Sequence, residues 1–407
     1  MVFHRMVPAL ALLSLALGGS SCDRMRGGGE NKEAPKAAGD SATTAATKAP
    51  AASDTILIGE FGSLTGSEAT FGQSTHNGVV LAIKEVNAAG GIKGKKVAVR
   101  TYDDQGRAQE AGTAVTRLIT DDKVVAVLGE VASSLSIAGG RVAQQYKVPM
   151  ISPSSTNPQV TQIGDMIFRV CFLDDFQGWA GAKFARDHLK AQTAAVLYDQ
   201  AQAYSKGLND YFSKAFGELG GKIAATQAYS GGDQDFSAQL TTIRAANPDV
   251  IYLPGYYTDV ANVILQARKL GIKAPFLGGD GWDSSQLAAI GGQAVEGSYF
   301  TNHYSPDEER PVVQEFVKKY NADYGATPDG LAALGYDAAK LLFDAMARAE
   351  ALDGPSLAKA IAASKDFQGV TGVFSIDPKR DAKKPAVVVV VKNGKPAYVT
   401  TIAPPTS

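Results

Sequence analysis

Short apolar runs alternate with longer amphipathic segments along most of this chain, and this alternation limits its fold more than any other feature. A helix over residues 78–87, for example, places Val79, Ile83 and Val86 on one face and ends before Gly90. A repeated strand and helix pattern of this kind predicts parallel sheets covered by helices. The apolar runs are residues 56–58, 97–99, 124–128, 194–198 and 250–253.

The strand pattern predicts an α/β protein with two doubly wound parallel-sheet lobes joined by a hinge. About ten predicted strands are more than one sheet holds comfortably. The 407 residues are enough for two lobes with cores of their own. We expect residues 55–173 and 302–350 to form the first lobe, and residues 174–301 and 351–407 to form the second.

Composition excludes several classes of partner. The net charge is −1, with 45% hydrophobic and 20% charged residues, so the chain as a whole is not disordered. A nearly neutral protein has no electrostatic field that would attract nucleic acid or anionic lipid. The sequence therefore predicts a small-molecule partner and no nucleic acid.

The first residues have the pattern of an export signal. Residues 1–21 contain a weakly basic start and an uncharged apolar run too short to span a bilayer, so we expect a signal peptide. Small residues before Cys22 resemble a bacterial lipobox, although Gly19 stands where leucine is usual. We expect Cys22 to be lipid-modified; the alternative is ordinary secretion.

Residues 22–54 predict a flexible tether behind this anchor. From Asp23 onward this segment has no aromatic residue and no valine, isoleucine or leucine, so it cannot bury enough apolar surface to fold. If Cys22 is acylated, Cys171 is the only other cysteine and no internal disulfide is possible.

Two short loops follow neighbouring apolar runs and are rich in small hydroxyl residues. They are residues 129–134 (Gly-Glu-Val-Ala-Ser-Ser) and 152–158 (Ser-Pro-Ser-Ser-Thr-Asn-Pro), and we call them the two serine-rich loops. Ligands collect at the carboxyl ends of parallel strands, so the two loops predict one cup of hydrogen-bond donors suited to a carboxylate. The alternative is that both are ordinary turns and helix caps.

Two further strand ends, residues 252–257 and 276–282, offer phenols and one carboxylate. Glycines flank that carboxylate, Asp280, so a ligand can approach it closely, and a lone carboxylate suits a cation. A turn or cap role for Asp280 fits the sequence equally well.

The order of motifs resembles the leucine/isoleucine/valine-binding protein family, the extracytoplasmic substrate-binding components of branched-chain amino-acid ABC transporters. The resemblance runs from Thr55 to about Tyr398 and implies the type I periplasmic-binding-protein fold. The motifs that carry it are residues 56–59, 64–66, 87–94, 102–104, 129–134, 151–158, 235–237 and 255–257.

The resemblance implies a role for individual residues. Ser133, Ser154 and Thr156 match positions that bind the ligand carboxylate, Ser154 through its backbone and Thr156 through its backbone and hydroxyl. Tyr256 and Asp280 match positions near the ligand ammonium.

Two aromatic residues match ligand contacts of the family: Phe71 in the first lobe and Tyr204 in the second. Core packing is the alternative for both. Two departures stand out: Asp280 replaces a glutamate, and Ala132 occupies a position of the family's disulfide. The shorter aspartate weakens the expectation of a branched-chain ligand.

We therefore expect a monomeric, non-enzymatic binding protein that closes around an amino acid, branched-chain or otherwise small and apolar. It would deliver this ligand to an ABC permease of the inner membrane, from the periplasm or the outer face of the cytoplasmic membrane. The alternatives are a ligand-sensing receptor of the same fold and a transport binder for amides or urea. No cofactor or metal is expected, because the four histidines lack metal-ligand spacing and no nucleophile motif occurs.

Overall fold

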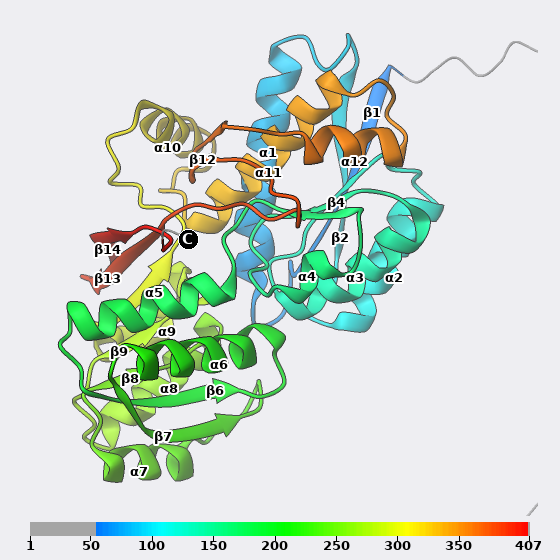
Figure 1. The fold of residues 1–407 in the computed structure, drawn as a ribbon. Helices are drawn as coiled ribbons and strands as arrows, with labels where there is room; N and C mark the ends of the chain where they lie inside the picture. Colours follow the sequence, from blue (N-terminus) through cyan, green and yellow to red (C-terminus); the bar gives the residue numbers. More distant parts are fainter. Residues whose placement is uncertain (1–53, 406–407) are drawn as a thin grey trace, which may run out of the picture. The chain divides into compact units, whose positions relative to one another are not determined.

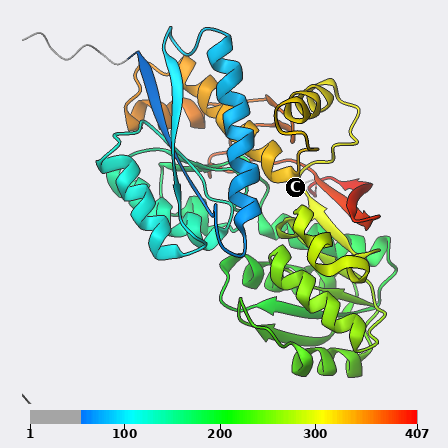
Figure 2. The same cartoon turned by 180° about the vertical axis from the view of Figure 1, so that it is seen from behind.

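A computed structural model describes residues 54–405 of the chain. The predicted signal peptide, Cys22 and residues 22–53 of the predicted tether lie outside the described residues. Across the described part, no helix is both long enough and apolar enough to cross a membrane. The described chain forms two sheets with helices packed on them, as Figures 1 and 2 show from opposite sides.

The first sheet has five strands in the order β2-β1-β3-β4-β5, and all of its pairings are parallel. Every residue of the three shortest strands is buried, which is why those runs lack the polar alternation of a half-exposed strand. The strands are β1 (Thr55–Gly62), β2 (Lys96–Asp103), β3 (Val127–Leu128), β4 (Met150–Ser152) and β5 (Ile167–Arg169). The helices among them are α1 (Ala69–Ala88), α2 (Ala108–Thr120), α3 (Ser133–Tyr146) and α4 (Gln159–Gln162).

The second sheet has seven strands in the order β14-β13-β10-β9-β8-β6-β7. Five are parallel, and a carboxyl-terminal hairpin adds two antiparallel strands at one edge. The strands are β6 (Thr193–Asp199), β7 (Lys222–Tyr229), β8 (Val250–Tyr252), β9 (Phe276–Gly278), β10 (Tyr299–Asn302), β13 (Ala386–Lys392) and β14 (Lys395–Ile402). The helices around it are α5 (Asp174–Asp187), α6 (Ala203–Glu218), α7 (Ser237–Ala246), α8 (Tyr257–Lys269), η1 (Asp280–Trp282), α9 (Ser285–Gly291) and η2 (Gly292–Val295).

The prediction of two α/β lobes is confirmed, and the antiparallel hairpin is the part that it lacked. Asn393 and Gly394 join β13 to β14, both with positive φ, as a tight hairpin turn requires. The edge strands β13 and β14 are thus joined directly by a hairpin turn, whereas the parallel strands are joined through helices.

The chain passes between the lobes three times. It leaves the first sheet after β5, returns after β10, and leaves again through residues 375–385 into β13. Between the second and third crossings it adds three helices and a two-stranded sheet. These elements are α10 (Pro311–Tyr324), α11 (Gly330–Arg348), α12 (Gly354–Ala362), β11 (Phe367–Gly369) and β12 (Gly372–Phe374).

The second-lobe range 351–407 is therefore divided in the structure. Helix α12 packs against α11 rather than on the second sheet, and only β13 and β14 join that sheet. The amphipathic pattern of α12 reveals that one face is buried but not which lobe supplies the covering surface.

Helix α11 packs against α1, and Figure 1 shows it running obliquely across that helix. The backbones come so close that a Cβ at Gly78 would lie 2.0 Å from the carbonyl oxygen of Ala332. Only glycine fits at such an approach. A segment some 250 positions later in the sequence thus covers α1, and the hydrogen bond from Tyr336 Oη to Glu85 Oε2 spans this junction at 2.7 Å.

Candidate functional site

The two serine-rich loops meet at the carboxyl ends of β3 and β4. The backbone N–H of Asn157 donates to Ser133 Oγ at 3.2 Å, which joins one loop to the other. Ser133 is the first residue of α3 and is buried. The prediction that both loops lie at one sheet edge is thus met by their geometry, because adjacent parallel strands end on the same side.

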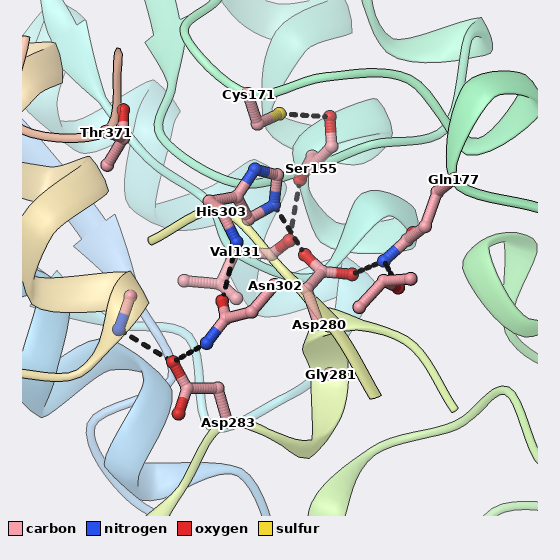
Figure 3. A network of polar contacts seen from close by, with 12 residues as sticks. Val131, Ser155, Cys171, Gln177, Asp280, Gly281, Asp283, Asn302, His303 and Thr371 are labelled. Carbon is pink, nitrogen blue, oxygen red and sulfur yellow. Dashed lines mark hydrogen bonds and ion pairs between the residues drawn. The ribbon is translucent and has the colours of Figure 1, made fainter. Parts of the chain in front are cut away.

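The hydroxyl of Ser155 ties the two loops together. Ser155 Oγ lies 2.9 Å from the carbonyl oxygens of Glu130 and Val131 and 2.7 Å from Ser136 Oγ, a network that Figure 3 shows in part. By contrast, the buried hydroxyls of Ser154 and Thr156 have no hydrogen-bond partner in the structure. A buried unpaired hydroxyl costs about 1–3 kcal/mol, so these two groups are available for a bound molecule.

Asp280 receives three hydrogen bonds from the protein and is not the isolated carboxylate that the sequence indicates. Gln177 Nε2 and Tyr204 Oη donate to Oδ1 at 2.7 and 2.9 Å, and His303 Nε2 lies 3.0 Å from Oδ2. Figure 3 shows the contacts with Gln177 and His303. A carboxylate has about four lone-pair sites, so roughly one remains for a ligand.

The glycine before Asp280 is explained by these partners. A Cβ at Gly279 would lie 2.3 Å from Tyr204 Oη and 3.0 Å from Gln177 Nε2. The close approach that the sequence indicates is therefore made by side chains of the second lobe.

His303 is a site residue that the sequence pattern does not single out, since the four histidines lack metal-ligand spacing. It directly follows β10, is fully buried, and stacks on Phe172 with ring centroids 3.7 Å apart. Burial lowers the pKa of His303, so the ring is neutral near pH 7. Because an ionised Asp280 only accepts, Nε2 carries the proton, and Nδ1 is left as a buried acceptor with no partner. Its place after a strand end was the one available signal.

Asp174 and Gln177 were also missed. Both lie in the first turn of α5 and are fully buried. The two carboxyl oxygens of Asp174 and Gln177 Oε1 have no hydrogen-bond partner. Burial raises the pKa of Asp174 well above its usual range, with the nearby Thr156 hydroxyl acting in the opposite direction. The helix begins directly after a crossing between lobes, which places its first turn beside the site.

Aromatic rings from both lobes form a cluster that reaches Asp280 through Tyr204. Tyr204 stacks on Tyr256 with centroids 5.4 Å apart and planes 9° from parallel. Phe71 of the first lobe meets the edge of Tyr256 at 5.4 Å and of Tyr257 at 5.2 Å. The hydroxyl of Tyr256 is buried and has no partner. The predicted aromatic residues thus form one cluster with the predicted Asp280.

Hydrogen bonds join the lobes on two sides of these residues. On one side, Asn157 Nδ2 donates to the Ala203 carbonyl at 2.9 Å, and the Ala203 N–H donates to Ser134 Oγ at 3.1 Å. On the other, Thr70 Oγ1 and Ser284 Oγ are 2.9 Å apart. A hollow of about 600 Å³ opens beside Asn157 and Ala203. The lobes are closed on each other at this site.

Within residues 54–405, no group of three or more histidine, cysteine, aspartate or glutamate side chains is arranged to hold a metal ion. What the site offers instead is hydroxyl donors from the first lobe and a hydrogen-bonded carboxylate from the second. Such a pair of surfaces suits a small molecule with opposite charges at its two ends.

Curated proteins of similar sequence are named as amino-acid-binding proteins. The chain is 35% identical to Leu/Ile/Val-binding protein homolog 1 of Brucella suis over 336 residues, 82% of this chain and 89% of that protein. It is 32% identical to the leucine-, isoleucine-, valine-, threonine-, and alanine-binding protein of Pseudomonas aeruginosa, over 82% of this chain and 88% of that one.

Solved structures of amino-acid-binding proteins are also similar to this chain. The leucine-binding protein LivK of Thermotoga maritima has a TM-score of 0.83 and 41% identity, over 86% of this chain and 99% of that one. LivJ of Streptococcus pneumoniae, a branched-chain amino-acid transporter substrate-binding protein in complex with isoleucine, has a TM-score of 0.81 and 33% identity, over 86% and 100%. The family described as periplasmic binding protein matches residues 55–396. The chain therefore belongs to the periplasmic binding protein family, and its relatives there are the leucine/isoleucine/valine-binding proteins.

Proposed function

We propose that this protein is the extracytoplasmic substrate-binding component of an ABC importer and that it binds an amino acid with a small apolar side chain between its lobes. The observation that carries the proposal is the set of buried, unpartnered hydroxyls at Ser154, Thr156 and Tyr256 beside a buried carboxylate. Buried polar groups are almost always paired, so each unpaired hydroxyl of this set calls for a partner.

A zwitterion supplies the partner for each surface. Its carboxylate would accept from Ser133, Ser154 and Thr156, and its ammonium would donate to Asp280 beside Tyr256. The aromatic cluster of Phe71, Tyr204 and Tyr256 would cover an apolar side chain. The likeness to proteins named for leucine, isoleucine and valine supports this ligand class.

Closure of the lobes is the step that makes the ligand recognisable to a permease. Ser133, Ser154 and Thr156 belong to the first lobe and Asp280 to the second, so only the closed arrangement binds both ends of the zwitterion. A ligand that binds the closed state better shifts the equilibrium toward it. A permease could then distinguish loaded from empty protein.

The test is a thermal-unfolding screen of the purified protein against the twenty amino acids, benzoate and urea, with mass spectrometry of any ligand released on denaturation. At a concentration of about 100 times Kd, a ligand raises stability by about 2.7 kcal/mol. We expect leucine, isoleucine or valine to give the largest shift. A shift with benzoate or urea alone would overturn the proposal.

Transport and anchoring have tests of their own. Cells lacking the protein should lose uptake of the labelled ligand, and recovery of a sensor kinase rather than a permease with the closed protein would contradict an import role. A Cys22→Ala variant should be released from the membrane into the soluble extracytoplasmic fraction; an unchanged distribution would contradict lipid anchoring at Cys22.

A further inference from the structure

Arg169, the last residue of β5, is a fully buried guanidinium behind the second serine-rich loop. Its Nε donates to Asp381 Oδ1 at 2.7 Å, and the side chain of Asp381 is nearly as deeply buried. Its Nη1 donates to the carbonyl of Ser155, and its Nη2 donates to the carbonyl of Asn157 at 2.9 Å. All three nitrogens of the guanidinium thus have an acceptor, two of them in the loop that carries Thr156.

The carbonyl of Ser155 and the N–H of Thr156 belong to one peptide group. In a trans peptide these two groups point in opposite directions. Holding the Ser155 carbonyl toward Arg169 therefore turns the Thr156 N–H away from it. Cys171 Sγ, 3.3 Å from the same carbonyl oxygen, supports this orientation, as Figure 3 shows.

The Thr156 N–H has no acceptor among the backbone and side-chain groups of residues 54–405. The hydroxyl of the same residue is also unpartnered and buried. Two donors of one residue are thus left for a ligand. A cation on the far side of a peptide also polarises it, which makes its N–H a stronger donor.

We propose that Arg169 is a positioning residue for the ligand carboxylate: it orients and polarises the Ser155–Thr156 peptide so that the Thr156 N–H donates to the bound amino acid. Asp381 holds the guanidinium in that position. This inference rests on the proposed function, since it requires a ligand with a carboxylate.

Asp381 also connects the loop to the third crossing between the lobes. It lies within residues 375–385, and its Oδ1 accepts from Thr161 Oγ1 at 2.8 Å as well as from Arg169. The backbone N–H of Arg169 donates to the backbone carbonyl of Arg380, which lies in the same crossing, at 3.2 Å. The second serine-rich loop is therefore fixed to one of the three segments that connect the lobes.

The test compares L-leucine with L-leucinamide, which keeps the ammonium and side chain but has no negative charge. We expect Arg169→Met to weaken leucine binding by about 10-fold or more, the value of one charge-assisted hydrogen bond, and leucinamide binding by much less. An equal loss for both ligands, or no loss, overturns the proposal, because a general loosening of the pocket affects the two alike.

Arg348→Met is the matched control. Arg348 also donates to a carboxylate, Asp344, and to a backbone carbonyl, that of Ala360, but it lies at the end of α11 away from the site. It should lower the melting temperature without changing the ratio of the two affinities. A changed ratio in this control would count against Arg169 as well.

A second measurement covers the case in which Arg169→Met does not fold. Arg169→Lys keeps the charge but cannot bind two carbonyls and a carboxylate in one plane. The protein is labelled with 15N-threonine and the chemical shift of the Thr156 amide proton is measured. On addition of leucine this proton should shift downfield in the wild type and by less in Arg169→Lys. Equal shifts overturn the proposal. A wild-type protein that binds no amino acid overturns the proposed function together with this inference, whereas normal leucine binding by both Arg169 variants overturns this inference alone.

Discussion

The phenol of Tyr204 donates to Asp280, with 2.9 Å between Oη and Oδ1, while its ring stacks on Tyr256. The carboxylate and the aromatic surface of the second lobe are therefore one connected unit. A change at the acid alters the ring that is expected to cover the ligand. This connection makes Asp280 the first position to test.

Asp280→Asn should weaken amino-acid binding by about 2 kcal/mol or more, because the ligand ammonium would be buried beside a neutral amide. Calorimetric titration measures this loss. Asp337→Asn is the matched control, since Asp337 is also buried and accepts three hydrogen bonds, from Val370 and Thr371. The control should lose stability but keep its affinity; unchanged affinity in Asp280→Asn would remove Asp280 from the site.

Ser154→Ala and Thr156→Val should each weaken ligand binding and leave the melting temperature of the ligand-free protein unchanged or slightly higher. Neither hydroxyl has a partner within hydrogen-bond geometry, although that of Thr156 lies near Asp174, so their removal breaks no formed hydrogen bond within the protein. The expected loss of affinity is about 1.5–3 kcal/mol for a hydrogen bond to a charged group. Calorimetry and thermal unfolding measure the two effects separately.

Ser155→Ala is the contrasting variant for this pair. Its hydroxyl takes part in the network with Glu130, Val131 and Ser136, so its loss should destabilise the free protein by about 1–3 kcal/mol. Stability losses of the same size in all three variants would mean that Ser154 and Thr156 are ordinary turn residues.

The strand-end rule located both serine-rich loops and Asp280 from the sequence, because each follows an apolar run whose place in a parallel sheet is a local property. The partners of Asp280 could not be found in this way. Gln177 comes from α5, 103 positions away, and its contact depends on how two elements pack. Arg169 looks like any strand-end residue until the third crossing brings Asp381 to it.

Asn157→Ala should speed ligand release, because it removes the hydrogen bond from Asn157 Nδ2 to the Ala203 carbonyl between the lobes. One neutral hydrogen bond is worth about 0.5–1.5 kcal/mol, which corresponds to about 2-fold to 10-fold in the dissociation rate. Stopped-flow displacement measures that rate. Asn262→Ala, which removes a bond to Thr258 within α8, should leave the rate unchanged, and equal effects would contradict a role in closure.

The free energy of unfolding should fall as the pH rises, because Asp283 is protonated in the folded protein and ionises with rising pH. Burial, reinforced by the charge of Asp329, raises the pKa of Asp283 to about 7. The folded protein therefore holds a proton that the unfolded chain releases near pH 4, so the contribution of Asp283 is fully present below about pH 4 and is lost as the pH rises through about 7.

Asp283→Asn should remove this dependence. Both hydrogen bonds of Asp283, from Asn302 Nδ2 and the Gly330 N–H, go to one oxygen, so an amide can keep them. Relative to the wild type, the variant should gain about 2–3 kcal/mol between pH 5 and pH 8. Asp104 and Asp259, whose pKa values are raised to about 6, are present in both proteins and cancel in the comparison. An identical difference in melting temperature at both pH values would contradict the assignment.

The late arrival of α11, β13 and β14 has a consequence for how the protein is made. Helix α1 is covered by α11, and the second sheet gains its last two strands only from residues 386–402. During synthesis, therefore, neither lobe can reach its final packing until most of the chain has been translated.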